Sequence, residues 1–106
     1  MLVFAKSIFK PERRAELFRM VREEILPMLE KCDGFFDEIT LELDTHPRKF
    51  YAISLWRDEQ DAKKYHKECF PKIYDMLEPF LIAPITVKHG TIDETIGKKL
   101  VTAVAA

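Results

Sequence analysis

The sequence is poor in glycine and cysteine, and each shortage excludes a class of protein. The 106 residues include three glycines, which argues against a loop-rich design or a glycine-rich loop that cradles phosphates. The two cysteines, Cys32 and Cys69, are too few for a disulfide framework and lack the spacing of a metal site. We therefore expect two reduced, largely buried thiols.

Blocks of like charge and long apolar runs are also missing. The 17 basic and 18 acidic residues are mixed along the chain, so nothing indicates a nucleic-acid partner or a polybasic membrane contact. No segment approaches the ~18 apolar residues of a membrane span. Lys6 interrupts the apolar N-terminal run, and no small-residue cleavage site of a signal peptide follows it. We expect a cytoplasmic protein.

What the chain does contain is typical of one soluble globular domain. Hydrophobic residues make up 47% of it and charged residues 33%, and the length is enough for a single core. Eight phenylalanines, three tyrosines and one tryptophan supply aromatic surface that can fill a core or line a cavity.

Apolar periodicity predicts the order βαββαβ. Four β-favouring runs are expected to form strands, at residues 2–9, 35–43, 49–56 and 85–90. A first helix should begin at Pro11, be kinked by Pro27 and end before Gly34, where a left-handed cap is wanted. A second should start at the N-cap residue Asp58 and run to about Leu77, with an interior proline of its own.

Split βαβ units in this order close into a ferredoxin-like antiparallel sheet of the α+β class, with both helices on one face. The runs 2–9 and 49–56 are nonetheless apolar on both faces. An antiparallel strand with one solvent-exposed face usually alternates between apolar and polar residues. At ~25 cal/mol per Å² of buried apolar area, covering the second face would favour association by several kcal/mol. We expect a homodimer whose two sheets face each other.

The second helix carries the candidates for chemistry. On a helical wheel of about 100° per residue, His66 lies about 35° from the centre of the apolar arc and Tyr65 about 65° from it on the opposite flank. We expect His66 to point toward the sheet and to serve as a base near neutral pH, with Tyr65 as a second catalytic candidate. Candidates for substrate binding or for stabilising a developing oxyanion are Ser7, Tyr51, Trp56, Phe70 and Tyr74.

A structural role is the alternative for each of these residues. A histidine at the border of an apolar face more often hydrogen-bonds within the structure, and tyrosines at helical spacing usually pack. His46 and His89 are interpreted as structural or exposed, and three scattered histidines predict no metal site.

Four motifs resemble the antibiotic biosynthesis monooxygenase superfamily of dimeric α+β barrels. They are the first-helix end ILPMLEKCDGFF, the strand end ISLWRDEQDA, the helix YHKECFPKIYDMLEPFL and the strand after APITV. The resemblance covers residues 1–92 and leaves 93–106 as a C-terminal extension, an edge strand or a dimer contact. It implies a homodimer that binds a small molecule and needs no cofactor.

The superfamily includes monooxygenases of aromatic quinols, haem-degrading enzymes and enzymes that process phosphorylated autoinducer-2. The segment PRKFYAISLWRDEQDAKKYHK is particularly similar to the last group. Relatives often place a histidine nine residues after the position of Trp56, where Tyr65 stands here, with His66 one step later. The asparagine, tryptophan and histidine of the haem-degrading members are absent at the matching positions, Ala5 or Ser7, Tyr65 and Tyr74.

The resemblance therefore implies a cofactor-independent monooxygenase acting on a small aromatic or quinol-like substrate. Two alternatives stay open. One is isomerase-type processing of a small phosphorylated carbonyl compound, and the other is a non-catalytic dimer module that binds a small ligand.

Overall fold

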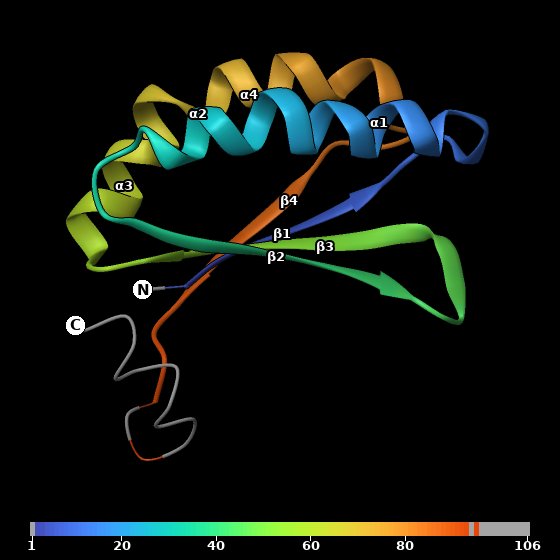
Figure 1. Cartoon of the computed structure of the whole chain (residues 1–106). Helices are drawn as coiled ribbons and strands as arrows, with labels where there is room; N and C mark the ends of the chain where they lie inside the picture. Colours follow the sequence, from blue (N-terminus) through green and yellow to red (C-terminus); the bar gives the residue numbers. More distant parts are fainter. Residues whose placement is uncertain (1, 94, 96–106) are drawn as a thin grey trace.

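A computed structural model of the protein describes residues 2–93 and 95, and its elements follow the order βαββαβ (Figure 1). The strands are β1 (Leu2–Ile8), β2 (Phe35–Leu43), β3 (His46–Trp56) and β4 (Thr86–Gly90). They form one sheet in the order β2-β3-β1-β4, and every neighbouring pair is antiparallel. The predicted ferredoxin-like α+β architecture is confirmed.

The first helical region begins at Pro11, as predicted, and its winding changes along its length. A 3-10 turn (Pro11–Arg13) leads into α1 (Arg14–Met20), a π-helical turn (Val21–Ile25) and α2 (Leu26–Glu30). Pro27 has no N–H for the carbonyl four residues earlier, and the turn before it widens so that the Leu26 N–H donates to the Val21 carbonyl.

Gly34 follows this region and has a positive φ of 75°. A Cβ at this position would also collide with the Asp61 side chain. Glycine is therefore required at this turn both for its backbone conformation and for the close approach of the second helical region.

The second helical region is split, where the sequence predicted one helix with an interior proline. It consists of α3 (Glu59–Glu68), α4 (Phe70–Leu77) and a 3-10 turn (Glu78–Phe80). The break lies at Cys69, because Pro71 cannot donate to the carbonyl of the turn before it. The N-cap prediction is confirmed, since the Asp58 carboxylate accepts the Asp61 N–H at 2.9 Å.

All helices lie over one face of the sheet, which we call the inner face (Figure 1). The core between the two layers contains Phe9, Leu17 and Trp56, each with no exposed surface. Phe9, Phe18 and Phe50 form an aromatic cluster in it, with ring centroids 5.2 to 5.9 Å apart.

The opposite, outer face of the sheet carries apolar side chains without a helix layer. On β2, Ile39 is 39% exposed and Leu41 is 48% exposed. The two residues paired with them on β3, Ile53 and Tyr51, are half-buried. This is the surface that the predicted homodimer would cover.

Within residues 2–93, no helix is long and apolar enough to cross a membrane. The proposed C-terminal extension, 93–106, lies outside the described residues except for Asp93 and Thr95, so its role as an edge strand or dimer contact stays a prediction.

Candidate functional site

A cavity of about 260 Å³ lies between the inner face of the sheet and the helices. Its wall is mostly apolar, with phenylalanine side chains from three different elements: Phe18 from α1, Phe50 from β3 and Phe70 from α4. Small-molecule sites are typically apolar clefts with a few polar groups that fix the orientation of the ligand.

The polar part of the wall comes largely from β2. In the register of the sheet, Glu38 is paired with Ser54 and Thr40 with Ala52, and all four residues line the cavity. Residues paired across antiparallel strands project from the same face. Glu38, Thr40 and Glu42 of β2 therefore point toward the helix layer, and Ile39 and Leu41 point to the outer face.

Glu38 is half-buried, and its carboxyl group forms no hydrogen bond with another described residue. Burial raises the pKa of this carboxyl to about 8, and the negative charge of the adjacent Asp37 adds to the shift. A carboxyl group with a pKa near the working pH can both accept and return a proton.

Tyr65 reaches the same cavity from α3 and is 8% exposed. Its ring stacks on Trp56 at a centroid distance of 4.7 Å, and the Trp56 indole N–H donates to Ser54 Oγ at 2.9 Å. Burial first, and then the charge of Glu38, raises the pKa of the Tyr65 hydroxyl above its ordinary value. The hydroxyl therefore stays protonated and is available as a hydrogen-bond donor.

His66 is half-buried and is not part of the cavity wall. Its ring stacks on Phe70 at 5.1 Å and meets His89 of β4 edge-on at 5.4 Å. Its Nδ1 atom is buried and has no hydrogen-bond partner among the described residues.

The helical wheel placed His66 closer than Tyr65 to the centre of the apolar face. This ranking of burial is wrong, because Tyr65 is the more buried of the two. The wheel treated residues 62–80 as one helix, but the break at Cys69 separates α3 from α4. Within α3 alone, Ala62 and Tyr65 are the buried residues.

The other predicted site residues are divided between the cavity and its surroundings. Ser7, 2% exposed, lines the cavity together with Phe70. Trp56 is fully buried and contacts the lining residue Tyr65. Tyr74 is half-buried, with its ring 6.2 Å from that of Phe70, and it does not line the cavity.

Tyr51 lies on the opposite side of the sheet, because it alternates with the lining residues Phe50 and Ala52 along β3. The structure thus brings Ser7, Tyr65 and Phe70 to the cavity. It adds Glu38, which the sequence reasoning did not single out. The signal for Glu38 was the alternation in strand 35–43, where Glu38, Thr40 and Glu42 face the helices if Ile39 and Leu41 face another copy of the sheet.

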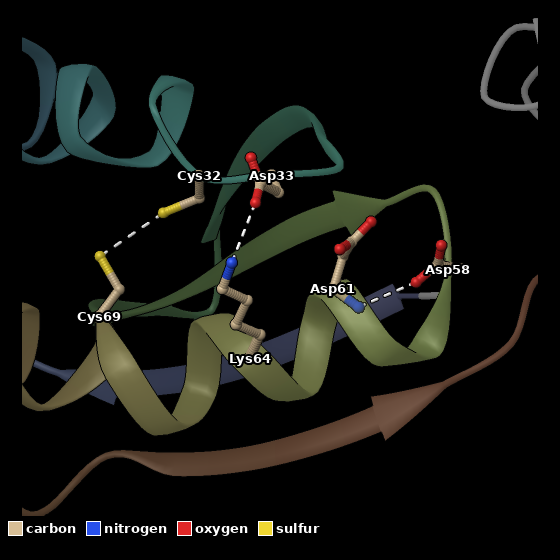
Figure 2. A network of polar contacts seen from close by, with 6 residues as sticks. All are labelled: Cys32, Asp33, Asp58, Asp61, Lys64 and Cys69. Carbon is tan, nitrogen blue, oxygen red and sulfur yellow. Dashed lines mark hydrogen bonds and ion pairs between the residues drawn. The ribbon is translucent and has the colours of Figure 1, made fainter.

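The two cysteines meet at a second hollow, where the end of α2 approaches α3 (Figure 2). Their Sγ atoms are 3.6 Å apart and both thiols are free, but both cysteines are half-buried rather than largely buried as predicted. Lys64 contacts Asp33 at 3.0 Å beside them. Burial raises the pKa of Cys32 to about 12, so this thiol is a poor nucleophile at neutral pH. Among the described residues, no three His, Cys, Asp or Glu side chains are grouped to hold a metal ion.

The sequence matches no family model and no curated protein. Solved structures do match it. A Bordetella bronchiseptica protein assigned to the antibiotic biosynthesis monooxygenases superimposes with a TM-score of 0.74 at 14% identity, covering 87% of this chain and 95% of that one. The chain has the antibiotic biosynthesis monooxygenase fold.

Two further structures show the range of proteins with this antibiotic biosynthesis monooxygenase fold. A monooxygenase from the gene ActVA-Orf6 of Streptomyces coelicolor, in complex with the ligand nanaomycin D, gives a TM-score of 0.66 at 14% identity over 87% of this chain and 89% of that one. A conserved protein of Methanosarcina mazei gives 0.66 at 22% identity over 85% and 91%.

Proposed function

We propose that the protein is a cofactor-independent monooxygenase that oxidises a small aromatic, quinol-like molecule in the cavity of the inner face. The observation that carries the proposal is an apolar, phenylalanine-lined cavity whose wall also contains Glu38 and Tyr65. An aromatic ring suits the apolar part of the wall, and a ring hydroxyl suits these polar side chains. The antibiotic biosynthesis monooxygenase fold and the ligand-bound Streptomyces monooxygenase support the same reaction class.

The substrate itself supplies the electrons in this reaction. One atom of O2 enters the ring of the quinol, the other leaves as water, and the ring is oxidised to a hydroxyquinone. All four electrons that O2 accepts come from the substrate, so the balance requires no further reductant. The protein has to bind the ring, take up a proton from its hydroxyl group and keep competing water out.

We further propose that the active form is a homodimer in which the outer faces of two sheets pack together. Exposed Ile39 and Leu41 on β2 support this arrangement, because apolar side chains at neighbouring positions of one face lose contact with water when a second copy covers them.

The phosphorylated-carbonyl alternative is less consistent with the charges of the cavity. Its ionisable lining residues are Arg22, Glu38, Glu42 and Tyr65, and Arg22 is the one cation on the described wall. Two carboxyl groups next to a single guanidinium are a poor environment for a phosphate group. A neutral aromatic ligand has no such conflict.

Oxygen uptake with 1,4-naphthoquinol tests the proposed function, with autoxidation subtracted from a sample without protein. The wild type should accelerate uptake, and Ala52→Phe should lose most of the activity because the new ring fills the cavity. Ala15→Phe is the matched control, since Ala15 is exposed on α1, and it should retain the activity. A wild type that does not accelerate uptake, or an Ala52→Phe variant that is fully active, would contradict the proposal.

A further inference from the structure

We infer that Glu38 is the base that accepts the proton of the substrate's ring hydroxyl, an inference that rests on the proposed function. Glu38 projects from β2 into the cavity, beside the polar wall formed by Ser54 and Tyr65. This assignment moves the proton-accepting role from the second helix, where the sequence placed it, to the second strand.

The Glu38 carboxyl group is partly shielded from solvent and is also accessible from the cavity. Its carboxyl group is half-buried under the helices, it lines the cavity, and no described residue holds it in a hydrogen bond or an ion pair. Buried carboxylates that have only a structural role usually form a hydrogen bond or an ion pair within the protein. A carboxyl group that is sheltered but unpaired at the wall of a cavity can make its hydrogen bond to a ligand.

The neighbouring candidates lack this combination. Glu42, four positions closer to the end of β2 and on the same face, is exposed and paired with the Arg14 guanidinium. His66 lies outside the cavity wall, against Phe70 and His89. Among the described residues of the wall, Glu38 is the sheltered acid without a cationic partner.

The ionised carboxylate of Glu38 takes the proton from the ring oxygen, the O–H bond breaks, and its electron pair stays on the ring as a phenolate. The phenolate is richer in electrons and passes one to O2 more readily. The Tyr65 hydroxyl, which stays protonated, donates a hydrogen bond to the oxygen that carries the new charge. The reduced O2 adds to a ring carbon, and protonated Glu38 returns its proton to the resulting peroxide. The O–O bond then breaks as that carbon loses its C–H proton, a C=O bond forms, and the departing hydroxide takes up this second proton to leave as water.

The environment of Glu38 matches this role. Burial raises its pKa to about 8, which makes it a much stronger base than an exposed carboxylate while it is ionised. Asp37 on β2 contributes to the shift. Arg22 from the first helical region, Glu42 from β2 and Tyr65 from α3 are the other ionisable groups of the cavity wall.

The kinetic test compares kcat/KM for naphthoquinol oxidation by the wild type, Glu38→Gln and Glu24→Gln between pH 6 and 9. Wild-type kcat/KM should rise with pH toward about 8 as Glu38 loses its proton. Glu38→Gln should lower it by about 100-fold or more and abolish this rise. Glu24 is exposed and outside the cavity, so its variant should behave as the wild type. An active Glu38→Gln with the wild-type pH profile would overturn the assignment.

A binding measurement separates failure of this assignment from failure of the proposed function. Calorimetry with 1-naphthol under nitrogen requires no turnover. Wild-type affinity should increase as Glu38 ionises and can accept the naphthol O–H, and Glu38→Gln should bind more weakly and show no such increase. If the two proteins bind naphthol with the same pH-independent affinity, Glu38 is not the acceptor, whether or not quinols are oxidised. If the pH dependence is present but no quinol is oxidised, the acceptor is confirmed and the monooxygenase proposal is contradicted.

Discussion

β2 and β3 are neighbours in the sheet and contribute opposite chemistry to its inner face. From β3, Phe50, Ser54 and Trp56 are buried there. From β2, Glu38 is paired with Ser54 and Glu42 with Phe50, and Thr40 lies between them on the same face. Both strands line the cavity, but the inner side chains of β3 are largely buried, whereas those of β2 are polar and half-buried or exposed.

This difference explains why β2 has its apolar residues on the outer face. The inner side chains of β2 are the polar residues Glu38, Thr40 and Glu42 of the cavity wall, so its apolar residues Ile39 and Leu41 lie on the outer face, where a second sheet could cover them. Substitutions in the two strands should accordingly have effects of different size and kind.

The largest effect on stability is expected at the end of β3. Trp56→Ala removes a side chain with no exposed surface and should lower the free energy of unfolding by about 3–5 kcal/mol, because a large cavity remains. Urea denaturation measures this loss. Ile82→Ala is the control, since Ile82 is 51% exposed and should change the free energy by less than about 1 kcal/mol. Equal losses in the two variants would contradict the close packing around Trp56.

Glu38→Gln, in contrast, should raise the free energy of unfolding, and the size of this increase should depend on pH. The folded-state pKa of about 8 lies above the unfolded value of about 4.3, so the folded protein binds more protons and loses stability as the pH rises between these values. Above pH 8, Glu38→Gln should be more stable than the wild type by about 2–4 kcal/mol, and at pH 4 the two should be equal.

Thermal melts at several pH values check this prediction. Glu42→Gln serves as the control, because Glu42 is exposed and ion-paired, and its replacement should change stability by about 0–1 kcal/mol at any pH. A Glu38→Gln variant that is destabilised above pH 8 would show that the carboxylate has a partner in the folded state.

On the outer face, Leu41→Lys should weaken the proposed homodimer by about 10-fold to 100-fold in Kd, because burying a leucine contributes about 1.5–3 kcal/mol. Sedimentation velocity over a concentration series measures the shift. Glu24→Lys, which adds a cation to an exposed helix position, should leave the association unchanged. A wild type that is monomeric at high concentration would refute the dimer itself.

The smallest effect is expected when β2 is made more like β3 without a change of volume. Thr40→Val removes one hydroxyl group from the cavity wall at an accessible position and should change the free energy of unfolding by no more than about 0.5 kcal/mol. Denaturant titration checks this value. A loss of more than about 2 kcal/mol would show that the hydroxyl is a structural hydrogen-bonding group.

Local chemistry was sufficient to predict most of the fold. The Asp58 N-cap, the left-handed Gly34 and the βαββαβ order all follow from neighbouring residues, and the structure has each of them. The break at Cys69 depends on Pro71, which the sequence places inside the helix without showing how far it shifts the helical register.

The site was less predictable, because it depends on contacts between distant segments. Alternation in strand 35–43 shows that Glu38 and Ile39 face opposite ways, but only the pairing of β2 with β3 decides which side lies under the helices. The choice between Tyr65 and His66 depended in turn on a helical register that the break at Cys69 interrupts.

Direct titration of Glu38 is the measurement that tests the account at its centre. In protein labelled with 13C at glutamate side-chain carboxyls, the resonance missing from Glu38→Gln identifies Glu38, and its shift is followed from pH 3 to 10. The account predicts a midpoint of about 8, which moves when 1-naphthol is bound under nitrogen. A midpoint near the ordinary glutamate value of about 4.3, unaffected by naphthol, would contradict it, because the carboxyl group would then be solvated and have no part in a ligand site.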